Sequence, residues 1–334
     1  MSLPIDGAQK TLRERVTLSG IGVHSGKPVT MVIGPADADA GIVFSRTDAA
    51  GRNGVDIAAV RSAVAASRRC TVLGDPNGVY VATVEHLLAS LCALGVDNAL
   101  IEIDGPEVPI MDGSAAAFVD AIDSAGLMVQ SASRRFIKVV KPVRVEMGEA
   151  FAEFRPHDGR RFEIEIDFAC GVIGRQGLTA DLTAHSFRHD IARARTFGHM
   201  KDVERLWGAG LALGSSLENS VVIGEAAVVN PEGLRWEDEF VRHKVLDAIG
   251  DLALAGAPII GAYRSYKGGH KLNADALGAL LAREDAFEMV TAPATGARKV
   301  GRKFLGESRG ESRGESRGEA LPGIPAPAFA PDIS

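Results

Sequence analysis

The chain has 334 residues, of which 46% are hydrophobic, and a formal net charge of −6. This length suits about two domains with real cores, and the acidic balance argues against a nucleic-acid surface as the main partner. Three cysteines without a Cys-x-x-Cys pair suggest neither a disulfide framework nor a thiolate metal site. Because no segment reads as a signal peptide or a membrane span, we expect a cytoplasmic protein, and peripheral membrane contact is compatible with these features.

The first β-rich region surrounds a glycine-rich loop. Its short strand candidates are residues 16–18, 29–33 and 41–44. Between the first two lies Ser19-Gly-Ile-Gly-Val-His-Ser-Gly26, which holds His24. This loop could wrap a ligand or simply connect a hairpin, and it lacks the spacing of a Walker or dinucleotide-binding loop.

A helix is predicted over residues 85–94, with Thr83 as its N-cap and Gly95 just beyond its end. Leucines at helical spacing give this helix a core-facing side. Glu85 and His86 lie next to each other in its first turn. Most such pairs belong to an ordinary surface, so the pair alone does not indicate a site.

The β pattern restarts after a small, polar segment, residues 130–134, which we interpret as a linker. Alternation of apolar and charged residues from Phe162 to Phe168 predicts a half-exposed antiparallel strand. Shorter elements follow: a helix at 200–207, strands at 221–223 and 226–229, and a final helix from about residue 274 to 283.

The richest pattern lies on one long helix, predicted over residues 235–252. Its apolar residues form one stripe, and His243, Asp247 and Asp251 at i, i+4 and i+8 line a separate face. A helix that places an imidazole one turn before a carboxylate can offer both groups to one metal ion. Taken alone, the spacing is more typical of a solvated polar face.

A faint internal repeat favours a metal site over a solvated polar face. Glu85-His-Leu-Leu and Arg242-His-Lys-Val both open a helix that leads through a glycine to a strand. The repeat suggests two similar α+β halves docked face to face, so that His86 and His243 could meet at the interface. With Asp247 they would form a set of two imidazoles and one carboxylate, which suits Zn²⁺, accepts Fe²⁺ and leaves a position for water.

Other polar residues could serve hydrolysis at such a metal. Glu85 could take a proton from the metal-activated water, and Thr196 could donate a hydrogen bond to the tetrahedral intermediate. His270, expected on a loop after two glycines, could protonate a leaving amine or stabilise an oxyanion. From its spacing, Asp251 could orient Asp247.

Two lysines and four histidines are harder to interpret. Lys244 and Lys267 would be ordinary solvated lysines on any helix or loop, but beside a metal cleft they would attract an anionic substrate. The remaining histidines have no partner spacing and are expected on the surface: His157, His185, His189 and His199.

Taken in order, six motifs resemble those of one family. They are Gly22-Val-His-Ser-Gly, Thr83-Val-Glu-His-Leu-Leu, Met111-Asp-Gly-Ser-Ala, Arg195-Thr-Phe-Gly, Arg242-His-Lys-Val-Leu-Asp-Ala-Ile-Gly-Asp-Leu and Gly269-His-Lys-Leu-Asn. The set is similar to that of the UDP-3-O-acyl-N-acetylglucosamine deacetylases, the zinc amidases that commit Gram-negative bacteria to lipid A synthesis. The resemblance covers roughly residues 8–290.

The resemblance implies a fold and a catalytic set. The fold is α+β, with two similar domains, each a β-sheet with helices, and the helices packed between the domains in a sheet-helix-helix-sheet sandwich. The implied zinc ligands are His86, His243 and Asp247. The other implied catalytic residues are Glu85 as general base, His270 as electrophilic or acid histidine, Asp251 as the carboxylate near it, and Thr196 as the oxyanion donor.

The resemblance also implies a substrate-binding set. Lys244 and Lys267 match basic residues near the diphosphate, and Phe168 an aromatic residue near the uracil. Phe197 and Met200 would lie near the reacting sugar and the start of an acyl passage built by residues 200–222. Two departures stand out: His199 replaces an aromatic residue found in many relatives, and the stretch 144–151 has no lysine where some relatives carry one.

The expected domains are residues 1–130, with Glu85 and His86, and residues 136–300, with His243, Asp247, His270 and the acyl-passage insert. Residues 131–135 would link them. Residues 301–334, which repeat Gly-Glu-Ser-Arg three times from Gly306, are expected to be a disordered low-complexity tail.

The sequence therefore predicts zinc-dependent removal of the N-acetyl group from UDP-3-O-(3-hydroxyacyl)-N-acetylglucosamine, giving the free amine and acetate. Two alternatives stay open: a zinc amidase of the same scaffold that acts on another acylated amide, and a non-catalytic nucleotide-sugar-binding protein. Glu85, Thr196 and His270 argue against the second alternative, because binding alone requires no base beside a metal ligand.

Overall fold

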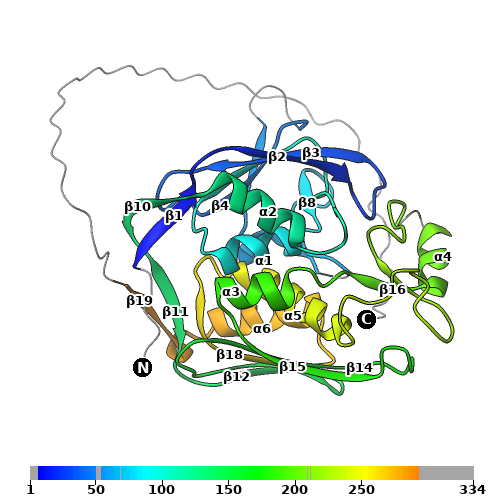
Figure 1. Ribbon diagram of the computed structural model, residues 1–334. Coiled ribbons are helices and arrows are strands. Elements are labelled where there is room, and N and C mark those ends of the chain that lie inside the picture. Colours follow the sequence, from blue (N-terminus) through cyan, green and yellow to red (C-terminus); the bar gives the residue numbers. More distant parts are fainter. Residues whose placement is uncertain (1–6, 50–53, 68, 209, 211, 293–334) are drawn as a thin grey trace, which may run out of the picture.

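Two β-sheets form the outer layers of the molecule, and helices fill the space between them (Figure 1). The computed structural model describes residues 7–292, apart from residues 50–53, 68, 209 and 211. The α+β class and the sheet-helix-helix-sheet layering predicted from the sequence are confirmed. No helix in the described part of the chain is long and apolar enough to cross a membrane. The predicted tail, residues 301–334, lies outside the described residues.

The first half of the chain builds one outer layer. A five-stranded sheet has the order β2-β3-β9-β4-β5, and a smaller sheet has the order β6-β7-β8. The strands are β2 (Val16–Ile21), β3 (Pro28–Pro35), β4 (Ile42–Arg46), β5 (Val55–Ala58), β6 (Val64–Ala66), β7 (Val72–Gly74), β8 (Tyr80–Ala82) and β9 (Ala99–Ile103), with a 3₁₀ turn, η2 (Arg61–Ala63). Every second residue of β9 is buried, so this sheet packs one face against the helices.

Two helices line the inner face of this layer, α1 (Glu85–Leu94) and α2 (Ala116–Ala125). Gly95, in the left-handed conformation (φ 81°), ends α1 as predicted. The prediction that Thr83 caps α1 is wrong, because Val84 holds the cap position without a side-chain hydrogen bond. Thr83 itself has a left-handed backbone (φ 58°), and its hydroxyl donates to Glu107 Oε1 at 3.0 Å.

The second outer layer is a seven-stranded sheet whose central strand, β18 (Ile259–Tyr266), pairs with β11, β13 and β14. The other strands are β11 (Arg135–Val139), β12 (Val143–Met147), β13 (Ala150–Arg155), β14 (Arg160–Asp167), β15 (Arg175–Asp181) and β19 (Phe287–Thr291). In β14 the predicted alternation is confirmed, and the strand pairs antiparallel with β15. Its parallel pairing with β18 was not predicted.

A two-stranded sheet of β1 (Ala8–Leu12) and β10 (Leu127–Ser133) runs along one side of the sandwich (Figure 1). The segment predicted as a linker is therefore regular: it comprises the end of β10, Arg134 and the start of β11. The division into domains at this segment stays a prediction.

The helices of the second half lie on the inner face of its sheet. They are α3 (Ala184–Ser186), the π-helix η3 (Phe187–Ile191), α5 (Glu239–Ala253), α6 (His270–Leu281) and a 3₁₀ turn, η4 (Glu284–Ala286). α5 begins four residues later than predicted, because the Glu239 carboxylate accepts the backbone N–H of Arg235 (2.6 Å) and holds that residue outside the helix. α6 begins four residues earlier than predicted, so His270 opens a helix and does not lie on a loop.

A small insert lies at the opposite side of the sandwich from β1 (Figure 1). It contains β16 (Phe197–His199), α4 (Met200–Gly208) and β17 (Val221–Ile223), and β16 pairs with β17 in parallel. The strand predicted at 226–229 does not form, and its only β-contact in the described chain is a bridge between Val228 and Ile223.

The two layers share one hydrophobic core, with large buried side chains from both halves, such as Phe44, Phe154 and Phe240. At its centre α1 packs against α5. A Cβ atom at Gly250 would lie 2.0 Å from the carbonyl oxygen of Glu85, so only glycine fits at this crossing. The close approach brings the first turn of α1 against the polar face of α5.

Candidate metal centre

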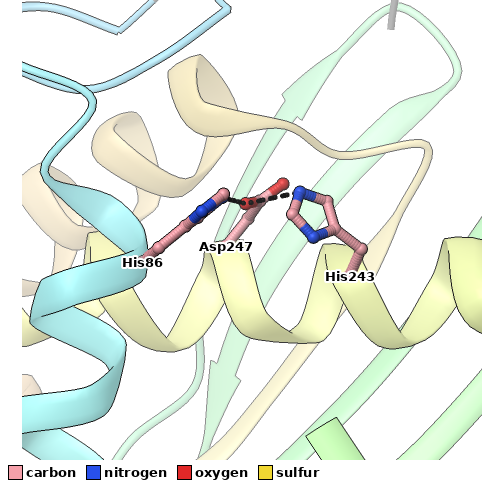
Figure 2. A group of neighbouring side chains, drawn as sticks. All are labelled: His86, His243 and Asp247. Atoms are coloured by element: carbon pink, nitrogen blue, oxygen red, sulfur yellow. Dashed lines mark ion pairs between the residues drawn. The ribbon is translucent and has the colours of Figure 1, made fainter. Parts of the chain in front are cut away.

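Three side chains from these two helices converge at the crossing (Figure 2). His86 comes from α1, and His243 and Asp247 come from successive turns of α5. The Nε2 atoms of His86 and His243 lie 3.5 and 3.4 Å from Asp247 Oδ1, and the two imidazole centroids are 5.0 Å apart. The structure thus brings together the three residues that the sequence predicted as ligands.

The geometry of these three groups fits a divalent cation. Two ligand atoms about 2.0–2.1 Å from a tetrahedral ion are about 3.3 Å apart, close to the observed separations. Asp247 Oδ1 is buried and has no hydrogen-bond partner among the residues that the structure describes. His243 Nδ1 donates to the carbonyl of Ala194 (3.0 Å), which leaves the lone pair of Nε2 facing Asp247.

Burial and charge keep these groups in the protonation states that a metal ion needs. Burial lowers the pKa of His243 to about 4, so its imidazole is neutral. Burial alone would raise the pKa of Asp247, but the positive charges of Lys244 and His270 hold it well below its usual value. A neutral imidazole and an ionised carboxylate are the ligand forms that bind divalent cations.

Glu85 and His270 flank this cluster from two different helices. Both are buried, and His270 Nε2 lies 3.9 Å from Glu85 Oε1 and 4.0 Å from Asp247 Oδ2. Burial raises the pKa of Glu85. Burial would lower the pKa of His270, but the carboxylates of Asp251 and Asp247 prevail and raise it to about 10. A carboxylate base therefore sits beside an imidazolium.

Asp251 lies behind His270 and away from Asp247. Its Oδ2 accepts from His270 Nδ1 (2.9 Å) and Asn273 Nδ2 (2.8 Å), and its Oδ1 accepts from Thr71 Oγ1 (2.6 Å). The helical spacing had suggested that Asp251 orients Asp247, but the described residues show no hydrogen bond that links the two. The role implied by the resemblance, a carboxylate next to His270, agrees with this placement.

The cluster opens into a cavity of about 180 Å³. The predicted site residues that line it are Glu85, His86, Phe168, Thr196, Phe197, His243, Lys244, Asp247 and His270. Lys267 and Met200 are not among the lining residues. The Nζ atom of Lys267 instead lies 3.2 Å from Glu149 Oε2 and 3.3 Å from Asp167 Oδ2.

One wall of the cavity is aromatic. The Phe197 ring lies edge-on to Phe168 and Phe240, with centroids 5.9 and 4.9 Å away. Lys244 Nζ lies 5.4 Å from the centroid of Phe197 and 3.4 Å from Asp247 Oδ2. A cation, an aromatic face and the metal cluster therefore adjoin one another.

Comparison with known proteins agrees with the motifs. Residues 9–282 match the family model of UDP-3-O-acyl N-acetylglycosamine deacetylase. The chain belongs to this family. Proteins named UDP-3-O-acyl-N-acetylglucosamine deacetylase from Brucella ovis, Brucella abortus and Brucella melitensis are each 55% identical to it over 285 residues. These alignments cover 85% of this chain and 99% of each relative.

In this deacetylase-family chain, several residues of the site were missed by sequence reasoning. Arg69 lines the cavity, as does His199, which was expected on the surface. His24 also lines it, and its glycine-rich loop was one that the sequence suggested could wrap a ligand. Asn273 could have been found, because it follows His270 by three residues and a helix would place both on one face. Thr71 carried no such signal, since its partners are distant in the sequence.

Proposed function

We propose that this chain removes the N-acetyl group from UDP-3-O-(3-hydroxyacyl)-N-acetylglucosamine in the cytoplasm, giving the free amine and acetate, with zinc as its cofactor. The observation that carries the proposal is the buried, unpartnered Asp247 Oδ1 facing two imidazoles, with Glu85 and His270 on the same cavity. The 55% identity to relatives named for this reaction supports the substrate. The name of those relatives specifies a small-molecule substrate. We propose no nucleic-acid partner.

Zinc would be held by His86, His243 and Asp247, a set that Fe²⁺ would also suit. When bound, the ion supplies a Lewis acid that lowers the pKa of a water molecule and polarises the amide carbonyl.

Glu85 is the proposed general base. Its Oε2 accepts the backbone N–H of Thr71 (3.1 Å), which fixes the carboxylate and leaves Oε1 on the side of His270. Burial raises the pKa of this carboxyl, which makes the carboxylate a stronger base. In the reaction, Glu85 takes a proton from water as the water oxygen adds to the acetyl carbon.

His270 and Thr196 serve the second half of the reaction. The Thr196 N–H donates to Gly113 O (2.8 Å) and its carbonyl accepts from Val221 N (2.8 Å), which anchors the backbone of this residue beside the cavity. Its hydroxyl is the proposed donor to the oxyanion. The carbon–nitrogen bond then breaks, and the amine takes a proton from His270 or from protonated Glu85. His270 as a cation also stabilises the negative charge, whichever group is the acid.

The substrate-binding roles are proposed from position. Phe168 and Phe197 would contact the uracil and the sugar, and Lys244 would attract the diphosphate. Lys267 would have to exchange its carboxylate partners for a phosphate. Met200, the first residue of α4, would lie at the start of the acyl passage.

The test is acetate release by the purified full chain, with metal content measured in the same preparation. We expect turnover of the complete substrate and much lower kcat/KM for analogues that lack the 3-O-acyl chain or the UDP. Equal turnover of a simpler acylated amide would favour the alternative amidase, and substrate binding without acetate release would favour the non-catalytic alternative. Glu85→Gln should retain the metal and lose activity by about 10²–10⁴-fold.

A further inference from the structure

One buried threonine, Thr71, forms hydrogen bonds to two carboxylates of the proposed site, Glu85 and Asp251. Thr71, 2% exposed, precedes β7 and lies 14 residues before Glu85 and 180 residues before Asp251. Its backbone N–H donates to Glu85 Oε2 (3.1 Å), and its hydroxyl donates to Asp251 Oδ1 (2.6 Å). Its carbonyl accepts the N–H of Val84 (3.5 Å), which ties Thr71 to the start of α1.

The hydroxyl of Thr71 completes the coordination of Asp251. The other carboxylate oxygen already receives His270 Nδ1 (2.9 Å) and Asn273 Nδ2 (2.8 Å), and Asn273 is itself held by the hydroxyl of Tyr263 (2.6 Å). With donors on both oxygens, the carboxylate plane of Asp251 cannot turn. The imidazole of His270 is therefore held with Nε2 toward Glu85 and Asp247.

We propose that Thr71 is a positioning residue for the deacetylation, which sets the relative orientation of Glu85 and His270 through its amide and its hydroxyl. This inference rests on the proposed function. Thr71 does not act on the substrate itself. It fixes one oxygen of Glu85 so that the other is available to water, and it fixes Asp251 so that His270 keeps one ring orientation.

Two substitutions separate the hydroxyl from the backbone of Thr71. Thr71→Val keeps the shape of the side chain and the backbone hydrogen bond to Glu85, but it removes the one donor that Asp251 Oδ1 has among the described residues. Thr71→Ser keeps the donor. Thr11→Val is the matched control. Thr11 lies in β1, is also fully buried and does not line the cavity. Its hydroxyl accepts a hydrogen bond from Ala36 N (2.9 Å).

The kinetic test compares these variants in the metal-loaded full chain. We expect Thr71→Val to lower kcat about tenfold or more with KM within about twofold, and Thr71→Ser to restore most of kcat. Thr11→Val should lose stability without losing kcat. An unchanged kcat in Thr71→Val, or an equal loss in the serine variant, would overturn the proposal. If valine prevents folding, Thr71→Ala with Thr11→Ala makes the same comparison.

A coupling test asks whether the effect acts through Asp251. In an Asp251→Asn background, the valine substitution should cost little further kcat, because the carboxylate that the hydroxyl orients is gone. The same fold-loss in both backgrounds would contradict a role through Asp251.

A spectroscopic readout does not depend on turnover. In protein labelled with ¹⁵N-histidine, the Nδ1 proton of His270 should resonate downfield, shift in Thr71→Val and stay in place in Thr71→Ser and Thr11→Val. No shift in the valine variant would overturn the proposal. If the wild-type chain releases no acetate, the proposed function fails, and this measurement still decides whether Thr71 orients the pair.

Discussion

At the scale of single residues, the site concentrates negative charge where water is scarce. Glu85, Asp247 and Asp251 are all buried within one cluster, and His270 is the cation that contacts all three. Asp251 has donors on both oxygens, whereas Asp247 keeps one buried oxygen unpartnered among the described residues. This unpartnered Oδ1, which faces two imidazole nitrogens, is the clearest physical sign of a metal ion.

The first prediction follows from that oxygen. Asp247→Asn should weaken zinc binding by at least about 100-fold, because it replaces an anionic ligand with a neutral amide in a buried set. Metal content after dialysis against a graded series of chelator concentrations measures this loss.

Glu85→Gln is the control for Asp247→Asn, since it changes a neighbouring buried carboxylate that is not a ligand. It should keep its zinc and lose turnover. Equal zinc retention by both variants would contradict the ligand assignment of Asp247.

At the scale of elements, the site depends on how closely α1 and α5 approach. The backbone of α5 at Gly250 touches the backbone of α1 at Glu85, and a Cβ atom there would lie 2.0 Å from the carbonyl oxygen. Small residues at helix crossings set the distance between helix axes, and here that distance decides whether His86 can share an ion with His243.

Gly250→Ala should therefore destabilise the fold and separate the ligands. We expect a loss of about 2 kcal/mol or more of unfolding free energy, together with weaker zinc binding. Gly278→Ala is the matched control, another mid-helix glycine whose Cβ would meet only the end of the Arg61 side chain at 3.4 Å. Alanine there should be neutral or stabilising by about 0.5–1 kcal/mol. Chemical denaturation of both variants measures the difference, and equal stability would contradict the crossing argument.

A buried carboxylate ties the glycine-rich loop to the strained turn before α1. Glu107 accepts the N–H groups of His24 and Ser25 (2.9 Å each) and the hydroxyl of Thr83 (3.0 Å). Thr83 is β-branched with φ 58°, a conformation that costs energy unless neighbouring contacts hold it. The turn thus places Glu85 and His86, and the same carboxylate places His24 at the cavity.

Glu107→Gln should lower stability by about 1.5–3 kcal/mol, because a neutral amide replaces a carboxylate that accepts three hydrogen bonds. Since His24 lines the cavity, KM should rise more than kcat falls. Glu102 is a half-exposed glutamate on β9, and Glu102→Gln should leave both the stability and the kinetic constants unchanged. Steady-state kinetics with thermal melts tests this, and a fall in kcat at constant KM would argue against a role in substrate binding.

These elements also show how far a sequence can predict a site. The spacing of His243 and Asp247 follows from helical geometry, and the repeat of a His-bearing helix pointed to His86. Thr83 was misplaced because its hydroxyl goes to Glu107, a tertiary partner that no local pattern encodes. The start of α6 was missed because Gly268-Gly269 is typical of a loop, and no side chain caps the helix.

At the scale of the whole molecule, the candidate ligands come from both layers of the sandwich. His86 belongs to the helices of the first half and Asp247 to those of the second, while one hydrophobic core joins the two. A metal ion bound there would add a link between the layers, and it would bind the folded state only, because the unfolded chain separates the two ligand groups.

Removal of the metal should therefore lower the stability of the entire fold. At a free zinc concentration about 1,000 times the Kd, binding contributes about 4 kcal/mol, which corresponds to a Tm shift of about 6 °C for a protein of this size. Scanning calorimetry of the wild-type chain with and without chelator measures the shift. Asp247→Asn should melt at nearly the same temperature in both conditions, whereas Glu85→Gln should keep the wild-type difference. A wild-type Tm that does not respond to chelator would mean that no ion links the two layers.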